Sequence, residues 1–513
     1  MSSNDDDIKR MVSGSSVGLI GSVLGAMLQL LFGVVVVRLV SVSEYGLFSL
    51  AVVIVTTLSI ISMLGFGNSA PQLISKYQAK QEPENALGII KSSIAMVFII
   101  SVVISFVVIY FSEDISLFFG KQGLEDIIKI MALLIVSNSL ILTFVSVFRG
   151  VSKALPGALF NEVLNRLLRL IGLVVVYFYS LELIGVVWST VVASVLICFI
   201  FGVFTFSSVS KMFKGVIACN KSGELILFSM PIYGNAVIEL LLISTSTLLL
   251  GYLSNQEEVG YYGVAISIAR MLQLPLSALA FMYLPIATKV KVRESKKEVE
   301  ELFVSSTKWI VFITLPVFMI IVAAAEFVIT ALFGVEYKSS AMMMIILSIG
   351  FFVHVMMGPN AMTLLSYGYR KAIFISSIIA AVVNVALCFY LIPKLGGIGA
   401  AISLASAFVL SNLFISFNLF MKCGIHIVKM NYLKMLVFNL TLLLLVIWGL
   451  SHVSVISNGL YFVLMIILIV FVIISPLLTK SLDANDMNII ELIESRFSNN
   501  NHISTFVHKW VNR

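Results

Sequence analysis

The stretch KSSIAMVFIISVVISFVVIYF, residues 91–111, decides the fold class of this chain. Its only charged residue is the lysine at its start, and uncharged, mostly apolar residues fill the rest. A helix of about 20 residues crosses the roughly 30 Å hydrocarbon core of a bilayer, whereas barrel strands alternate in hydrophobicity over about 10 residues. The stretch therefore predicts a helix that spans a membrane.

Runs of this kind recur along the whole chain, which has 513 residues, 60% of them hydrophobic and only 12% charged. We divide the chain into predicted spans at residues 12–37, 46–68, 91–111, 126–148, 159–179, 183–206, 224–249, 259–283, 303–325, 341–367, 370–392, 397–421, 428–450 and 456–478. Helices satisfy their own backbone groups within lipid, so they are the expected form. The sequence predicts an all-α integral membrane protein with about 14 transmembrane helices.

The basic residues give an orientation to these spans. Of the 33 lysines and arginines, all but six fall in alternate segments that share one side of the membrane. The six exceptions are Arg38, Lys121, Lys129, Arg270, Lys338 and Lys394. Basic residues concentrate on the cytoplasmic side, so both termini are expected in the cytoplasm. The net charge of +7 then reflects topology, and no nucleic-acid partner is expected.

Similar local patterns recur in the two halves of the chain, at nearly constant separation. The matching pairs are Tyr45-Gly46 with Tyr262-Gly263, Gly150-x-x-Lys153 with Gly368-x-x-Lys371, Asn165 with Asn384, and Ile184-Gly185 with Ile398-Gly399. The separation corresponds to six helices, an even number, so the halves are expected to be parallel repeats related by an axis along the membrane normal. A cleft between two such bundles is the expected place for a substrate.

The repeat and the loops divide the chain into five parts. We expect an N-terminal six-helix bundle at 1–206, a cytoplasmic linker at 207–223, a C-terminal six-helix bundle at 224–421, helices 13 and 14 at 422–478, and a cytoplasmic tail at 479–513. The connections are short on both sides, so no part outside the membrane is large enough for a catalytic domain.

Several local motifs resemble one family of membrane proteins. They are Val37-Arg38-x6-Tyr45-Gly46, Tyr367-Gly368-Tyr369-Arg370-Lys371, Asn384 and the run from Leu391 to Ala401, LIPKLGGIGAA. In these motifs, in helix number and in loop lengths, the chain is similar to the polysaccharide-export flippases. These O-antigen and lipid-linked oligosaccharide translocases share a superfamily with multidrug exporters and the lipid II flippase.

The resemblance implies two six-helix bundles and transport of a polyprenyl- or dolichyl-linked glycan from the cytoplasmic to the outer leaflet of the plasma membrane. It also implies lipid-linked oligosaccharide and membrane lipids as partners, with a glycan polymerase or glycosyltransferases as further ones. Many relatives carry a charged pair near the outer end of helix 7. This chain has Ser244-Thr245-Ser246-Thr247 there, so the role of that pair is not carried over.

Glu239 and Arg270 are the most informative ionisable residues within the predicted spans. Each lies about eleven residues from the outer end of its helix, or roughly 16 Å at 1.5 Å per residue, so they share one depth near mid-membrane. They are expected either to form a structural ion pair or to line a cavity. In the cavity, Arg270 would attract a phosphate and Glu239 would accept a proton or a sodium ion.

Arg166 and Arg169 share a helix face with Glu162 near the cytoplasmic end of the fifth span. They are expected either to anchor that end in the cytoplasm or to bind the diphosphate of a lipid-linked sugar, for which arginine suits bidentate contact. Arg149 and Lys153 in the first half, and Arg370 and Lys371 in the second, allow the same two interpretations.

Four further residues complete the candidate site. Arg38 is expected to extend to the membrane surface from a helix end or to contact a headgroup during release. His354 is either a hydrogen-bonded interior residue or a proton-linked gate. Asn235 and Asn384 are expected to bridge helices rather than to bind sugar.

Signatures of enzymes and of metal sites are absent from the sequence. It has no Gly-x-x-x-x-Gly-Lys-Ser/Thr loop, no His-x-x-x-His and no Cys-x-x-Cys. We therefore expect no catalytic residues, no metal and no cofactor, with coupling to a proton or sodium gradient. The leading hypothesis is a flippase, and the alternatives are an ion-coupled multidrug or metabolite antiporter and a membrane-embedded glycan polymerase or ligase.

Overall fold

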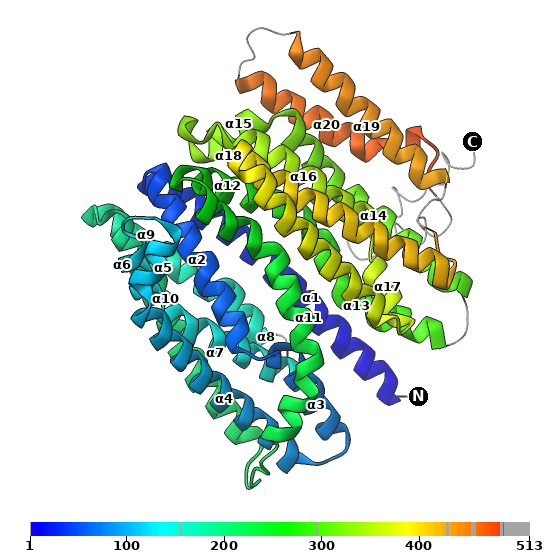
Figure 1. The fold of residues 1–513 in the computed structure, drawn as a ribbon. Coiled ribbons are helices and arrows are strands. Elements are labelled where there is room, and N and C mark those ends of the chain that lie inside the picture. Colours follow the sequence, from blue (N-terminus) through cyan, green and yellow to red (C-terminus); the bar gives the residue numbers. More distant parts are fainter. Residues whose placement is uncertain are drawn as a thin grey trace. The chain divides into compact units, whose positions relative to one another are not determined.

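A computed structural model of the chain describes residues 2–153, 155–292, 296–426, 430–452, 458–482 and 486. All regular structure in these ranges is helical (Figure 1). The first half holds α1 (Ser2–Leu39), α2 (Val42–Ser62), α3 (Phe66–Ala79), α4 (Pro83–Tyr110), α5 (Ser112–Phe119), α6 (Leu124–Met131), α7 (Leu133–Gly150), α8 (Leu155–Gly157), the π-helix η1 (Ala158–Leu164), α9 (Asn165–Tyr179) and α10 (Glu182–Met212).

The second half has the same all-helical character. It holds α11 (Ser222–Leu253), α12 (Gln256–Ala269), η2 (Arg270–Gln273), α13 (Leu274–Val292), α14 (Lys296–Ala323), α15 (Ala325–Phe333), η3 (Val335–Tyr337), α16 (Ser340–Met356), α17 (Asn360–Ser366), α18 (Arg370–Cys423), α19 (Met430–Ser451) and α20 (Asn458–Leu478). The prediction of an all-α membrane protein is confirmed.

Twelve helices in the described ranges are long and apolar enough to cross a membrane. Two features account for the difference from fourteen. The predicted spans 370–392 and 397–421 are two helices that meet at the non-helical residue Gly396, and the range of α18 covers both of them. The predicted span 159–179 is divided between η1 and α9 and carries Glu162, Arg166 and Arg169. The number fourteen stays a prediction.

The chain divides into two compact units. Unit 1 contains residues 1–268, 332–343 and 377–407, and unit 2 contains 269–331, 344–376 and 408–513. The predicted bundles and their parallel repeat stay predictions. The tail beyond residue 482 lies outside the described residues, apart from Asp486.

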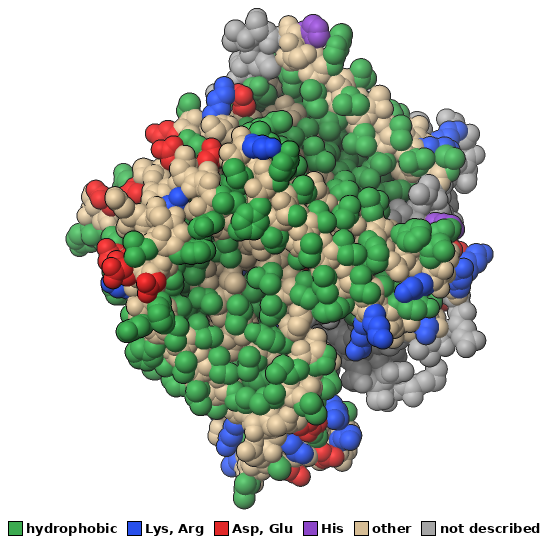
Figure 2. All heavy atoms as spheres, viewed as in Figure 1, with side chains coloured by type: hydrophobic (Ala, Val, Ile, Leu, Met, Phe, Trp, Pro, Cys, Tyr) green, Lys and Arg blue, Asp and Glu red, His purple; other side chains and the backbone are tan. Residues whose placement is uncertain are grey.

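In unit 1, α7 packs against α2, α3, α4 and α10. Buried apolar residues of α3 and α4, including Leu73, Ile74, Ile89 and Ile90, form a cluster with Val147 of α7. On the face of this unit shown in Figure 2, hydrophobic side chains cover the middle and charged ones gather at its ends. This pattern suits a helical bundle whose apolar surface meets lipid.

Glycines bring α2 and α12 into backbone contact within unit 1. A Cβ atom on Gly46 would lie 1.9 Å from the carbonyl oxygen of Gln256, and one on Gly260 would lie 2.5 Å from that of Val42. The Ser43 hydroxyl donates a hydrogen bond to Oε1 of Gln256 at 2.6 Å beside this crossing. The obstructing atoms belong to backbone, so a side chain at Gly46 requires the helices to separate.

Gly46→Ala is therefore expected to destabilise the protein by about 1–3 kcal/mol, the usual cost of forcing extra atoms into a packed contact. Gly33→Ala is the matched control, because a Cβ there meets no atom within 4 Å. Alanine also favours a helix over glycine by about 1 kcal/mol, so the control is expected to be neutral or stabilising. Thermal unfolding of both purified variants measures the difference, and equal midpoints would contradict the crossing.

The Gly-Gly pair in the motif LIPKLGGIGAA bends α18 and binds Glu258. Gly396 has φ +55°, which favours glycine, and the Gly397 amide donates a hydrogen bond to Oε2 of Glu258 at 2.6 Å. A Cβ on Gly397 would lie 2.6 Å from the Met343 side chain, and one on Gly399 would meet the Leu391 backbone at the same distance. Each glycine of the motif thus has its own steric reason.

Unit 2 contains a buried ion pair that joins distant parts of the sequence. Lys308 of α14 donates to the carboxylate of Asp486 and to the backbone oxygen of Ser481. The side chains of Lys308 and Asp486 are only 6% and 2% exposed. Trp309 adds an indole hydrogen bond to the other carboxylate oxygen at 3.1 Å. Residues 481 and 486 are thereby held to α14.

Candidate functional site

A polar cluster on η1 and α9 contains two of the predicted arginines. Phe160 anchors the π-helical segment, because its ring stacks on Phe201 of α10 with centroids 4.6 Å apart. The segment is followed directly by α9, so Glu162 and Arg166 lie one turn apart across the junction. Nη1 of Arg166 lies 2.6 Å from Oε2 of Glu162, which confirms their contact. Short π-helical segments often occur at functional sites.

Arg169 has a different environment from Arg166. Its Nε donates to Oδ1 of Asn165 at 3.2 Å, and its Nη2 donates to the Ser194 hydroxyl of α10 at 2.7 Å. Asn165 and Ser194 are buried, and Arg169 is half-buried. Within the described residues, its hydrogen-bond partners are uncharged groups only. Arg169 therefore keeps its full positive charge and part of its donor capacity for an anion.

The close approach of α1 to this cluster depends on glycine. A Cβ on Gly25 would lie 1.8 Å from Nη1 of Arg166, and one on Gly21 would lie 2.7 Å from Cβ of Ala158. The ion pair of Glu162 and Arg166 thus fits against bare α1 backbone. This packing keeps the two side chains in a defined place.

Asn384, the predicted repeat partner of Asn165, bridges helices without any cation. Its Nδ2 donates to the Leu242 carbonyl at 3.0 Å, and its Oδ1 accepts from Ser246 of α11 at 3.1 Å. Four residues after Asn165 stands Arg169, whereas four residues after Asn384 stands Cys388. The two asparagines therefore occupy similar buried positions, and only the one in α9 is paired with an arginine.

Glu239 and Arg270 both lie in candidate spans, Ala236–Leu253 and Gln256–Leu279. The Glu239 side chain is exposed and has no hydrogen bond or ion pair with any residue that the structure describes. Arg270 begins the short 3-10 segment η2, where α12 is interrupted, and is exposed as well. The two residues belong to different units, so their pairing stays a prediction.

The remaining predicted residues have separate surroundings. Arg38 lies in the last turn of α1 and donates from Nε and Nη2 to the Leu332 carbonyl at 3.3 and 3.2 Å. Nδ1 of His354 in α16 lies 2.9 Å from Oδ1 of Asn412, as for a hydrogen-bonded interior histidine. Asn235 lies in α11, but its side chain is outside the part that the structure describes.

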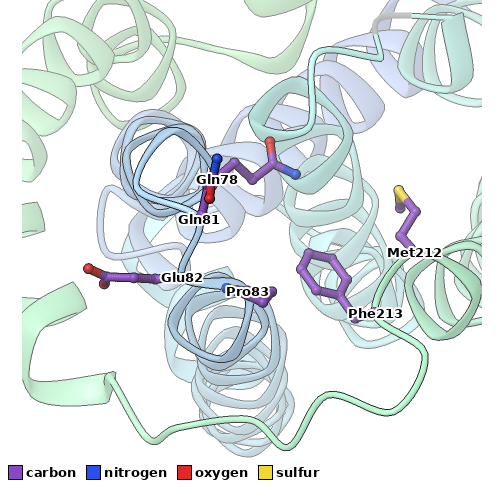
Figure 3. A pocket seen from close by; sticks show the side chains of 6 residues that line it. All are labelled: Gln78, Gln81, Glu82, Pro83, Met212 and Phe213. Carbon is purple, nitrogen blue, oxygen red and sulfur yellow. The ribbon is translucent and has the colours of Figure 1, made fainter.

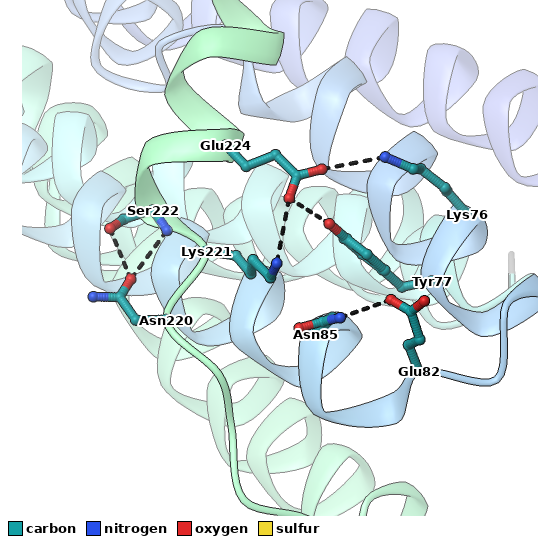
Figure 4. Close-up of polar contacts among 8 residues, drawn as sticks. All are labelled: Lys76, Tyr77, Glu82, Asn85, Asn220, Lys221, Ser222 and Glu224. Atoms are coloured by element: carbon teal, nitrogen blue, oxygen red, sulfur yellow. Dashed lines mark hydrogen bonds and ion pairs between the residues drawn. The ribbon is translucent and has the colours of Figure 1, made fainter.

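A polar cluster at the predicted cytoplasmic end of unit 1 was not anticipated. Figure 4 shows the Glu224 carboxylate of α11 between Tyr77, Lys76 and Lys221. The phenol of Tyr77 donates to it, and the two lysine ammonium nitrogens lie 3.2 and 3.8 Å away. Nearby, the Cys219 amide donates to the Glu84 carbonyl at 3.0 Å. The predicted linker is thus bound to the start of α4, and its Lys221 is paired with Glu224.

A groove of about 540 Å³ lies at the same end of unit 1. It is lined by Gln78, Gln81, Glu82, Pro83, Met212 and Phe213 (Figure 3). In this view the Glu82 carboxylate points away from the Phe213 ring. None of the predicted site residues lines the groove. No group of three or more metal-binding side chains occurs among the residues described.

The all-helical fold, with its many candidate membrane spans, is the fold of multi-pass transporters whose structures have been solved. The chain is similar to the lipid II flippase MurJ in an inward closed conformation, with TM-score 0.68, 15% identity, and coverage of 91% of this chain and 99% of that one. It is also similar to an inward-facing multidrug resistance MATE family transporter of the MOP superfamily, with TM-score 0.64, 13% identity, and coverage of 80% and 98%.

A third similar structure is a MOP superfamily transporter from Pyrococcus furiosus, with TM-score 0.60, 15% identity, and coverage of 81% and 96%. The family model described as "Polysaccharide biosynthesis protein" matches residues 11–291, more than half of the chain. The chain belongs to this family, and its structural neighbours are transporters rather than enzymes. No curated protein matches it. The resemblance to polysaccharide exporters is thereby confirmed.

Proposed function

We propose that this protein is a flippase that moves a lipid-linked oligosaccharide from the cytoplasmic to the outer leaflet of the plasma membrane. Membership of the polysaccharide biosynthesis family supports this proposal. The observation that carries it is Arg169, a half-buried cation beside a membrane helix junction whose described partners are Asn165 and Ser194. Such a group is costly in a membrane protein unless it meets an anion.

The proposed mechanism assigns the diphosphate of the substrate to Arg169, with Arg166 beside it. Lipid does not solvate phosphate or sugar hydroxyls, so a charged headgroup needs protein groups along its path. A guanidinium matches phosphate oxygens with two parallel hydrogen bonds. Glu162 holds the Arg166 side chain in place, so its hydrogen-bond donors are already oriented when the headgroup binds. Both termini face the cytoplasm in this proposal, which places the arginines at the entry side.

Glu239 supplies the proposed coupling to a proton or sodium gradient. Its exposed carboxylate lies in a candidate span of α11, without a described partner. Glu239→Gln removes the charge and keeps the shape of the side chain. It is expected to make transport in vesicles independent of an imposed pH or sodium gradient. If the variant responds to both gradients as the wild type does, Glu239 is not the coupling residue.

A second candidate function is an ion-coupled antiporter for drugs or metabolites. The fold similarity to a MATE family transporter favours this candidate. Deletion of the gene separates the two functions. The flippase proposal predicts that lipid-linked oligosaccharide accumulates in these cells. Its proposed partners are the glycosyltransferases that make this lipid or the polymerase that uses it. The antiporter predicts sensitivity to cationic drugs and normal levels of lipid-linked glycan, and this result would refute the flippase proposal.

A further inference from the structure

The motif Tyr367-Gly368-Tyr369-Arg370-Lys371 forms a turn in unit 2 between α17 and α18. We call residues 367–371 the basic turn. Gly368 has φ +87°, a conformation that favours glycine, and it separates the two tyrosines. Tyr369, Arg370 and Lys371 are all exposed. The turn lies at the end of α18 that is predicted to face the cytoplasm.

The ring of each tyrosine in the basic turn lies close to the ammonium group of a lysine from another segment. The Lys291 ammonium of α13 lies 5.7 Å from the ring centroid of Tyr367. The Lys422 ammonium near the end of α18 lies 4.9 Å from the ring centroid of Tyr369. Cation–π attraction acts at these distances. Two lysines distant in sequence are therefore oriented over one turn.

A third lysine joins them from the start of α14. A Cβ on Gly424, which has φ +63°, would lie 2.4 Å from Nζ of Lys296, so this ammonium group lies against bare backbone. Lys291, Lys296 and Lys422 all act electrostatically on the thiol of Cys423. The three ammonium groups thus converge on one region instead of scattering over the surface.

Among the residues that the structure describes, no acidic group pairs with these three lysines. None of the three lysines forms an ion pair with any described residue, including Glu298, Glu300 and Glu301 of the adjoining α14. The carboxyl end of α18 contributes only about half an elementary negative charge against three positive ones. At the corresponding end of unit 1, by contrast, Glu224 pairs with its neighbouring lysines (Figure 4).

Exposed apolar side chains adjoin the basic turn. Phe417, Phe420 and Met421, in the last two turns of α18, are 61%, 44% and 64% exposed. A ligand that suits this combination has a phosphate for the lysines and hydrocarbon for the neighbouring helix surface. Basic residues at a membrane surface attract anionic lipids in this way.

We propose that the lysines gathered at the basic turn bind the phosphate headgroup of an anionic membrane phospholipid. Lys291, Lys296 and Lys422 contact the phosphate, while Tyr367 and Tyr369 keep two of them oriented. The acyl chains lie along Phe417, Phe420 and Met421. This site is distinct from Arg166 and Arg169, and it does not depend on which substrate the protein transports.

The test compares two triple variants of the full-length protein that lose the same charge. K291Q/K296Q/K422Q removes the proposed site. K80Q/K211Q/K214Q is the matched control, because these lysines of unit 1 are exposed and their side chains form no hydrogen bond or ion pair with any described residue. Binding is measured by native mass spectrometry after addition of phosphatidylglycerol, phosphatidylcholine or a polyprenyl diphosphate. Thermal unfolding identifies a variant that fails to fold, and Y367L/Y369L then tests the same site with its charges kept.

Each lysine near an anionic surface contributes roughly a factor of five in affinity, so the site variant is expected to bind phosphatidylglycerol roughly a hundredfold more weakly. The control variant should bind it within about twofold of wild type, and Y367L/Y369L should be intermediate. Equal binding by the site and control variants would overturn the proposal. If the site variant loses binding of the polyprenyl diphosphate alone, the proposal is also overturned, because the region then binds substrate.

Discussion

Arg169→Gln is expected to lower transport of a lipid-linked oligosaccharide roughly tenfold to a hundredfold. A hydrogen bond to a charged group contributes about 1.5–3 kcal/mol, and the variant loses the charge along with the paired donors. The fold should survive, because the Ser194 hydroxyl already lies 3.4 Å from Oδ1 of Asn165 and these groups bind one another without the guanidinium. Initial rates in vesicles measure the effect.

Two further variants make this prediction specific. Arg169→Lys keeps the charge but loses the planar pair of donors, so it should retain an intermediate rate. Arg149→Gln makes the same chemical change at the end of α7, where no described contact involves the side chain, and should transport like wild type. If Arg169→Gln and Arg149→Gln have equal rates, the helix junction of η1 and α9 does not bind the headgroup.

Lys308→Met is expected to destabilise unit 2 by about 3–5 kcal/mol, because it removes the ammonium group that neutralises the buried Asp486 carboxylate. Asp486→Leu should have a similar effect for the same reason. The double variant should be more stable than the sum of the single effects predicts, since it removes both charges together. Thermal unfolding of the three purified variants gives the coupling.

The result that would contradict this account is additivity. If each single variant unfolds within about 1 kcal/mol of wild type, and the double variant equals their sum, the pair contributes nothing. Trp309→Phe is a milder probe of the same carboxylate. It removes one hydrogen bond of 3.1 Å and should cost about 1–3 kcal/mol.

The membrane-spanning character of the chain was predictable because bilayer thickness imposes a length on each apolar run. The exact helix boundaries were less predictable, because the predicted span 159–179 is divided between η1 and α9. The spans 370–392 and 397–421 were expected as two helices, and the sequence PKLGG between them does bend the chain at Gly396. Ser376 and Ser411, on opposite sides of that bend, are hydrogen-bonded to each other, so two helices lie against one another as two separate spans would. The glycine motif was recognised as a resemblance, but its contact with Glu258 was not foreseen.

Part of the candidate site was also predictable, because helical geometry fixes which residues of a segment lie close together. Contacts between residues one helical turn apart, such as Glu162 with Arg166, follow from residue spacing and are confirmed. Contacts between helices have no signal in a single sequence. Ser194 lies on a different helix from Arg169, and Asp486 is separated from Lys308 by more than 170 residues. Such partners depend on tertiary packing alone.

Transbilayer movement of a labelled lipid-linked oligosaccharide is the most direct test of the central claim. The purified protein is reconstituted into vesicles with the labelled lipid on both leaflets, and an impermeant oxidant of sugars is added outside. The proposed function predicts that the oxidised fraction rises from about one half toward completion, faster than in protein-free vesicles or with Arg169→Gln. An oxidised fraction that stays at one half with active, folded protein present would contradict it.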